Sequence, residues 1–212
     1  MNYILIIIIS YLIGSIPTGF IILKRTRNID ITKSGSGNVG ALNSFEITNS
    51  KIIGITVLTL DLLKGIFCVL IVKYFIGNIF IYQMTGLIAA VFAHCYSPWI
   101  KFSGGRGLAT ATGGILLLSL PVFFLWDLFW LLSYLIKRNI HIANFVATVG
   151  VAIIGFALTG LLNKYSTPPA VPQSSYGILI GILMFIILTK HVLPLKQYFD
   201  RLPYRQTGRR RF

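Results

Sequence analysis

The sequence predicts an all-α fold: a polytopic transmembrane helical protein with seven membrane helices and glycine-rich cytoplasmic loops. Hydrophobic residues make up 55% of the 212 positions and charged residues only 11%, too few to cover the exterior of a soluble domain of this size. Apolar runs recur at close intervals, and several reach the length of about 20 residues that a helix needs to cross a bilayer. Because these runs are continuously apolar rather than alternating, helices are favoured over a β-barrel. We expect residues 1–212 to form a single integral membrane domain.

The apolar runs and the breakers between them define the seven expected helices. The run beginning at Tyr3 has no basic residues before it and no small-residue cleavage site after it, so we interpret it as a retained helix rather than a signal peptide. The fourth and fifth helices are short and separated only by Ser119-Leu120-Pro121, so one broken helix is the alternative there. The expected helices cover about 3–23, 52–76, 79–99, 107–120, 122–136, 140–162 and 175–190.

The distribution of basic residues predicts the orientation of the chain. Sixteen of the 19 Lys and Arg residues lie in alternate connections and in the tail from residue 190, whereas the other side holds Lys164, with Lys73 near a helix end. By the positive-inside rule the N-terminus is outside and the C-terminus is cytoplasmic, across a bacterial inner membrane. This pattern explains the net charge of +14 without nucleic acid as a partner. The basic tail, about 191–212, is expected to contact anionic membrane lipid or to fix topology, with an acidic partner as the alternative.

Two segments on the predicted cytoplasmic side are rich in glycine. Residues 30–43 contain Gly35-Ser36-Gly37-Asn38, and residues 103–110 contain Gly104-Gly105-Arg106-Gly107 and lead directly into a helix. Glycine lets the backbone approach a ligand closely, and a helix that begins at such a loop adds its positive dipole end and free N–H groups. Arg106 places a fixed charge that can bind phosphate through two hydrogen bonds. We therefore predict a phosphate-binding site, with ordinary turns at helix ends as the alternative.

Few ionisable or sulfur-containing residues lie within the apolar runs. Asp61 and Lys64 are one helical turn apart in the second expected helix, where charged groups are expensive and mark a functional or polar-cavity site. A neutralising pair that only links helices is the alternative. Asp127 has no assigned role. Cys68 and Cys95 are expected to be small buried hydrophobes, and the absence of zinc-type spacing predicts no metal site.

The three histidines, His94, His141 and His191, all fall near cytoplasmic helix ends. None has an aspartate five positions on, which excludes the His-x-x-x-x-Asp arrangement that a large class of acyltransferases uses for acid and base chemistry. The chain also lacks a Gly-x-Ser-x-Gly elbow for covalent acyl chemistry.

Three segments resemble the motifs of the PlsY-type membrane acyltransferases, which move an acyl chain from acyl-phosphate to glycerol-3-phosphate. They cover roughly the N-terminal half of the chain in the family's order, and the resemblance implies lysophosphatidic acid as the product, in phospholipid synthesis. The segments are Gly14-Ser15-Ile16-Pro17 with residues 30–43; Leu60-Asp61-Leu62-Leu63-Lys64-Gly65; and His94 through Ser97-Pro98, Lys101-Phe102 and Gly104-Gly105-Arg106-Gly107 to Ala109-Thr110.

The resemblance also implies roles for individual residues. Ser36 and Arg106 would be catalytic, with Arg106, where the family usually has lysine, offsetting charge on the leaving phosphate. Family members are thought to use the acceptor's own phosphate as the base, so the enzyme would mainly supply proximity and electrostatics. No cofactor is implied, and an enzyme that makes acyl-phosphate would supply the donor. The substrate-binding set would be Gly35, Gly37, Asn38, Asn43, Lys64, Gly104, Gly105, Gly107 and His191.

The chain departs from the family pattern where the acceptor is expected to bind. The family has a threonine and an arginine where this chain has Leu42 and Glu46, and a carboxylate at the second position would repel the acceptor's phosphate. The serine-rich run before the family's sixth helix is His141-Ile142-Ala143-Asn144 here. His191 matches the family's histidine, but the asparagine three positions on is Pro194. The donor half of the site therefore matches the family, whereas the acceptor half diverges.

Three alternatives follow from this divergence. The same acyl-phosphate chemistry could serve a different acceptor, with Glu46 as a base or a hydroxyl-binding group. The chain could be a non-catalytic homologue. It could also be a small transporter of lipid precursors, which is disfavoured because its polar groups gather at one face rather than near the membrane midplane.

Overall fold

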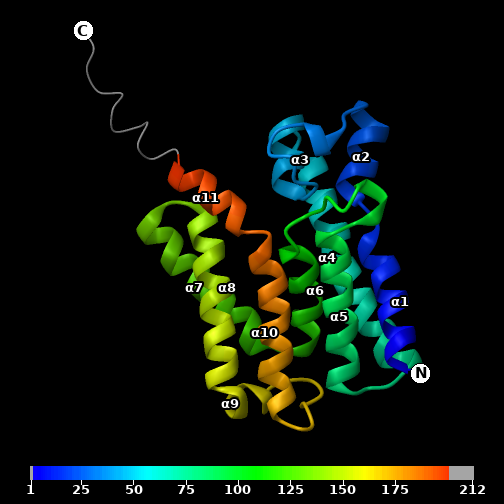
Figure 1. Cartoon of the computed structure of the whole chain (residues 1–212), viewed down its shortest axis with the longest axis vertical. Coiled ribbons are helices and arrows are strands. Elements are labelled where there is room, and N and C mark those ends of the chain that lie inside the picture. Colours follow the sequence, from blue (N-terminus) through cyan, green and yellow to red (C-terminus); the bar gives the residue numbers. More distant parts are fainter. Residues whose placement is uncertain (1, 201–212) are drawn as a thin grey trace.

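The computed structural model describes residues 2–200, which form helices joined by short connections (Figure 1). Within this range there is no β-strand, only an isolated bridge between Ser119 and Ser166. The arginines of the tail beyond residue 200 lie outside the described residues. In chain order the elements are α1 (Asn2–Ser15), α2 (Thr18–Arg27), η1 (Ile31–Lys33), α3 (Ala41–Thr48), α4 (Lys51–Phe75), α5 (Phe80–Cys95), η2 (Pro98–Ile100), α6 (Leu108–Leu118), α7 (Leu120–Lys137), α8 (Ile140–Ala157), α9 (Thr159–Asn163), α10 (Ser174–Thr189) and α11 (Val192–Asp200).

Each of the seven expected segments is helical, but fewer of them meet the length and composition of a membrane span. Among the described residues, four helices do so: the α1–α2 pair, α4, α7 and α8. A fifth is added if α10 and α11, which are bent by 42° relative to each other, count as one span. Helix α6 is apolar but has only 11 residues. The protein is therefore an all-helical chain with four or five candidate membrane spans.

The first expected helix, 3–23, is in fact two helices separated at Ile16-Pro17. Proline has no backbone N–H and its ring clashes with the preceding helical turn, so the ladder of hydrogen bonds stops there. The carbonyl groups that lose their helical partners at this break accept hydrogen bonds from side chains instead. Ser97 Oγ donates to Ser15 O at 2.6 Å, and Lys64 Nζ donates to Ile16 O at 2.5 Å.

Small residues bring the central helices close together. A Cβ at Gly14 of α1 would collide with the backbone of Ala90 in α5, and one at Gly65 of α4 with the backbone of Thr110 in α6. Within a bilayer the hydrophobic effect does not drive helices together, so they associate through close packing at small residues such as these. The largest buried cluster lies between α5, α6 and α10, and many outward-facing apolar side chains are exposed on the other helices.

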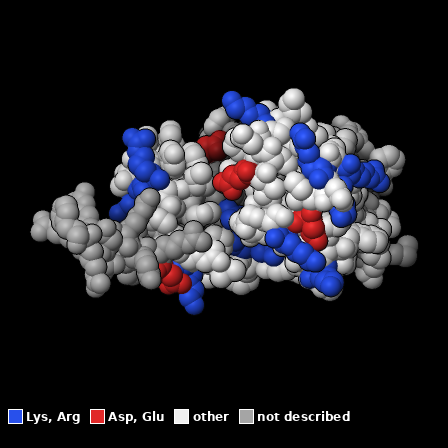
Figure 2. Space-filling view, turned by 90° about the horizontal axis from the view of Figure 1, so that it is seen from above, with Lys and Arg blue, Asp and Glu red and all other residues white. Residues whose placement is uncertain are grey.

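The two glycine-rich segments lie at the same end of the bundle. Figure 1 shows the α2–α3 connection and the loop that follows α5 at the top, together with α11, whereas the N-terminus lies at the bottom. Figure 2 views this upper end directly and shows Lys and Arg side chains around it, with fewer Asp and Glu. Exposed basic residues of the first connection include Lys24, Arg25, Arg27 and Lys33.

Candidate active site

The first glycine-rich loop is held in shape by Asn43, at the start of α3. This side chain is 3% exposed, and its amide makes three hydrogen bonds across the loop. Its Oδ1 accepts from Ser36 N at 3.0 Å, and its Nδ2 donates to Ser34 O at 3.2 Å and to Asn38 O at 2.7 Å. The loop needs glycine at two of its turns, because Gly35 and Gly37 have φ values of 58° and 71°.

Asp30 begins this loop by capping the short helix η1. Its carboxylate accepts hydrogen bonds from the backbone N–H and the hydroxyl of Thr32. The hydrogen bond from the hydroxyl is the main cause that lowers the pKa of Asp30 from its ordinary value. The carboxylate therefore stays ionised and keeps the entry to the loop ordered.

Several backbone N–H groups of the two glycine segments already donate within the protein. Ser36 N bonds Asn43, Gly37 N bonds Ser34 O, Gly40 N bonds the side chain of Asn38, and Gly105 N bonds His94 O. These four N–H groups are therefore engaged within the protein and are not free to bind a phosphate. The side chain of Arg106 and the N–H groups in the first turn of α6 remain as groups that can meet a ligand.

The second glycine-rich loop packs tightly on the end of α5. A Cβ at Gly104 would meet the carbonyls of the last residues of α5, and one at Gly105 would meet the ring of His94. Gly107 has a φ of 82° and caps α6, so the chain turns sharply between the loop and the helix. These three glycines thus hold Arg106 in place at the beginning of α6.

A polar cleft of about 340 Å³ joins the two loops. Arg106 lines it with Glu46, the carboxylate that replaces the family's arginine. Burial lowers the pKa of Arg106 from its ordinary value, and the charge of Glu46 acts in the opposite direction, so the guanidinium remains charged. The cleft is lined by Ser36, Asn38, Leu42, Asn43, Glu46, Arg106 and His141.

The polar cleft continues into two larger, more apolar spaces. A pocket of about 700 Å³ shares Asn38, Leu42 and Arg106 with the cleft and reaches Asp61, His94 and the first residues of α6. A groove of about 670 Å³ shares Leu42 with both and runs along α3 and α4. We call this space the apolar groove; it is lined by Ala41, Leu42, Phe45, Lys51, Gly54, Ile55 and Leu58.

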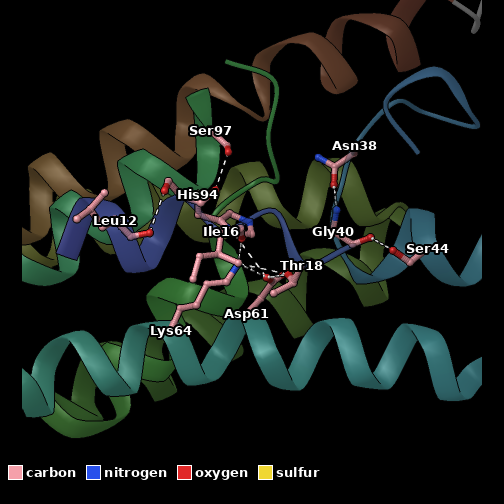
Figure 3. A network of polar contacts seen from close by, with 11 residues as sticks. Leu12, Ile16, Thr18, Asn38, Gly40, Ser44, Asp61, Lys64, His94 and Ser97 are labelled. Carbon is pink, nitrogen blue, oxygen red and sulfur yellow. Dashed lines mark hydrogen bonds and ion pairs between the residues drawn. The ribbon is translucent and has the colours of Figure 1, made fainter. Parts of the chain in front are cut away.

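Asp61 and Lys64 form a buried pair that pins the break between α1 and α2 (Figure 3). Lys64 Nζ lies 2.9 Å from Asp61 Oδ1 and also donates to Ile16 O and, at 3.3 Å, to Thr18 Oγ1. The hydroxyl of Thr18 donates to Asp61. The ammonium of Lys64 is thus engaged within the protein, and Lys64 is not among the described residues that line the polar cleft.

Figure 3 also shows His94 beside this pair. Its Nδ1 lies 3.7 Å from Asp61 Oδ1, and the side chain is 6% exposed. The sequence singles out His94 only as part of a resemblance. The structure places it between the buried pair and the second glycine-rich loop, where it lines the larger pocket.

His141 and His191, which are far apart in the sequence, lie near each other and near Arg106. The charge of Arg106 acts on both rings, and that of His141 acts on His191. His191 is fully buried at the end of α10, with Nδ1 2.9 Å from Ile187 O. Pro194 lies in α11 and does not line the cleft among the described residues.

Asp127 lies apart from these groups. It lines a separate, mostly apolar cavity of about 350 Å³ between α6, α7 and α10. The two cysteines, Cys68 and Cys95, are buried and unbonded to each other, as the sequence predicts.

Comparison with known proteins agrees with this arrangement. The family model described as glycerol-3-phosphate acyltransferase matches residues 4–201. A protein of Thermotoga petrophila named glycerol-3-phosphate acyltransferase is 36% identical over 191 residues, which is 90% of each chain. One of Thermotoga maritima, named glycerol-3-phosphate acyltransferase 2, is 39% identical over 160 residues, 76% of this chain and 81% of that one.

Solved structures give the same result. The crystal structure of PlsY, an integral membrane glycerol 3-phosphate acyltransferase, in its glycerol 3-phosphate form is 31% identical with a TM-score of 0.72, covering 100% of this chain and 96% of that one. The structure of its lysophosphatidic acid form also has a TM-score of 0.72, at 29% identity, and covers 94% of this chain and 93% of that one. The chain therefore belongs to the glycerol-3-phosphate acyltransferase family of membrane enzymes.

Proposed function

We propose that this protein transfers an acyl chain from acyl-phosphate to glycerol-3-phosphate and releases lysophosphatidic acid. The observation that carries this proposal is the continuity of the polar cleft with the apolar groove. A substrate with a charged head and a hydrocarbon tail needs adjoining spaces of these two kinds. The PlsY structures are of a glycerol 3-phosphate form and a lysophosphatidic acid form, which match the acceptor and the product of this reaction.

In this arrangement the phosphate of the donor lies against Arg106, and the acyl chain follows the apolar groove along α4. Acyl-phosphate is an activated mixed anhydride, so no covalent enzyme intermediate is required. Arg106 stabilises the charge that develops on the leaving phosphate. The hydroxyl of Ser36 and the amide of Asn38 line the same cleft and supply further hydrogen bonds, while Asn43 maintains the loop that presents them.

We also propose a membrane topology for the protein. All seven expected helices cross the bilayer, and the end that carries both glycine-rich loops faces the cytoplasm of a bacterium. The excess of basic residues in the connections at this end supports the orientation. Residues 1–212 then act as one domain, and an enzyme that makes acyl-phosphate supplies the donor from the cytoplasmic side.

A second candidate is the same donor chemistry with an acceptor that lacks a dianionic phosphate. The presence of Glu46 in the polar cleft favours it, because a carboxylate repels a phosphate and accepts hydrogen bonds from hydroxyl groups. The family model and the glycerol 3-phosphate form of PlsY nevertheless support an acceptor that carries a phosphate. We therefore keep glycerol-3-phosphate as the acceptor.

The test is acyl transfer by purified protein in lipid, given palmitoyl-phosphate and radiolabelled glycerol-3-phosphate. We expect labelled lysophosphatidic acid from the wild-type protein and none from Arg106→Ala, which serves as the control for a contaminating enzyme. Labelled product at the same rate from both would show that Arg106 has no role in the transfer. Consumption of donor without labelled product would favour a different acceptor.

A further inference from the structure

The polar cleft contains a histidine, His141, to which the sequence assigns no role. His141 stands in the first turn of α8, directly after Ile140, and the side chain of Asn139 caps this helix by accepting from His141 N and Ile142 N. The ring is half-buried and lines the cleft with Ser36 and Arg106. It therefore faces the space in which the donor's phosphate and the acceptor would meet.

The two nitrogens of this ring have different surroundings. Nδ1 is buried and has no hydrogen-bond partner among the described residues. Nε2 is not among the buried atoms that lack a partner, so the Nε2 edge is the accessible part of the ring. The side chain thus presents Nε2 to the cleft and turns Nδ1 toward the protein.

His191 is fully buried near His141 and carries its own proton on Nδ1. A carbonyl oxygen can only accept, so His191 Nδ1, 2.9 Å from Ile187 O, is the protonated nitrogen of a neutral ring. His191 Nε2 is then a lone pair, and it is buried without a partner among the described residues. His141 Nδ1 is likewise buried without a partner among the described residues, so the two rings are not hydrogen-bonded to each other. In the tautomer of His141 that carries its proton on Nδ1, the lone pair is on the accessible Nε2.

We propose that His141 Nε2 accepts the proton of the acceptor's hydroxyl during acyl transfer, an inference that rests on the proposed function. As the hydroxyl oxygen bonds to the acyl carbonyl carbon, its proton moves to Nε2. The bond between that carbon and the phosphate oxygen breaks, and phosphate leaves with the electron pair. The imidazolium then returns its proton to phosphate, so the ring is neutral at the start of each cycle.

The charged groups around His141 suit this role. Arg106, from the loop before α6, lines the same cleft, and a second positive charge beside its guanidinium is unfavourable, which favours a neutral ring before transfer. Glu46, from α3, lines the same cleft and stabilises the imidazolium once it forms. His191, from the end of α10, is fully buried nearby. This gives the chain a base of its own where family members are thought to use the acceptor's phosphate.

The proposal is tested with His141→Gln, which keeps a hydrogen-bonding side chain but cannot accept a proton at neutral pH. A positioned base contributes about 10²–10⁴-fold, so we expect kcat to fall by about 10²-fold or more. We expect KM for glycerol-3-phosphate to change by less than about threefold, since the base acts mainly in the transition state. The acid limb of the kcat–pH profile should disappear. Added imidazole should restore part of the rate to His141→Ala.

Other results would overturn the proposal. A His141→Gln protein that keeps wild-type kcat, or that loses only affinity for the acceptor, would make His141 a binding residue rather than the base. Donor consumption and labelled product are measured separately, so failure of the proposed function is distinguishable. If wild-type protein consumes palmitoyl-phosphate in a His141-dependent way without labelled product, glycerol-3-phosphate is not the acceptor, but His141 is still the base. A wild-type protein that consumes no donor would refute both.

Discussion

Replacement of Asn43 by alanine should uncouple the first glycine-rich loop from the rest of the site. The side chain is almost fully buried, and its amide bridges Ser34, Ser36 and Asn38. Alanine leaves the backbone of α3 intact because it is the best helix former. The substitution therefore removes the loop's internal hydrogen bonds with little other change.

The magnitude follows from the number of bonds lost. Three neutral hydrogen bonds are worth about 1 kcal/mol each, so the ordered form of the loop loses about 3 kcal/mol relative to its open forms. This corresponds to a population change of about 10²-fold. Because only the ordered loop presents Ser36 and Asn38 to the cleft, the apparent affinity for donor falls with the fraction of protein in that form, by at most the same factor.

The assay is kcat/KM for palmitoyl-phosphate, together with hydrogen exchange of the loop amides. We expect kcat/KM to fall by up to about 10²-fold and the amide of Ser36 to exchange faster. Ser44→Ala is the matched control, since it removes a single bond to Gly40 O from the neighbouring position. A decrease of less than about threefold in Asn43→Ala, with exchange unchanged, would refute the reasoning.

Three further substitutions test the buried pair, the second loop and the diverged acceptor position. Lys64→Met leaves the carboxylate of Asp61 without its cation and should lower the free energy of unfolding by about 3–5 kcal/mol, measured by thermal denaturation in detergent. The double variant with Asp61→Leu should recover most of that loss, and additive losses would contradict a mutual pair. Gly105→Ala forces a Cβ into the ring of His94 and should reduce acyl transfer by at least about tenfold. A wild-type rate would show that the loop can move to accommodate the added methyl group. Glu46→Arg should lower KM for glycerol-3-phosphate or leave it unchanged, while the loss of the carboxylate beside His141 lowers kcat; a raised KM would mean that Glu46 itself binds the acceptor.

The position of the helices can largely be predicted from the sequence, because continuous apolar runs have few alternatives in a bilayer. The break at Pro17 could not be predicted in this way, because the apolar run continues across it. Proline itself is nevertheless a strong local signal for a helix break. Helix α3 could not be predicted from the apolar runs either. It has only eight residues, and its stability comes from packing on α4 and from the Asn43 bonds rather than from local propensity.

The site is only half predictable, for a related reason. The glycine strings and Arg106 are contiguous in the sequence, so their position on one side of the membrane follows from the order of residues alone. The approach of Glu46 to Arg106, and of His141 to His191, depends on how α3, α8 and α10 pack, and no local pattern records it. The engagement of Lys64 by Ile16 O likewise depends on a helix break that the apolar pattern conceals.

The apolar groove has a consequence for the range of acyl chains that the enzyme can use. Its lining residues Ile55 and Leu58 are 62% and 46% exposed on the outward side of α4, so the groove opens laterally instead of ending in a wall. A channel that acts as a molecular ruler needs a closed end against which the terminal methyl group stops. An acyl chain in this groove instead extends into the surrounding lipid, whatever its length. With acyl-phosphate as the donor, as we propose, chain length would be selected by the enzyme that makes the donor, before the substrate reaches this protein.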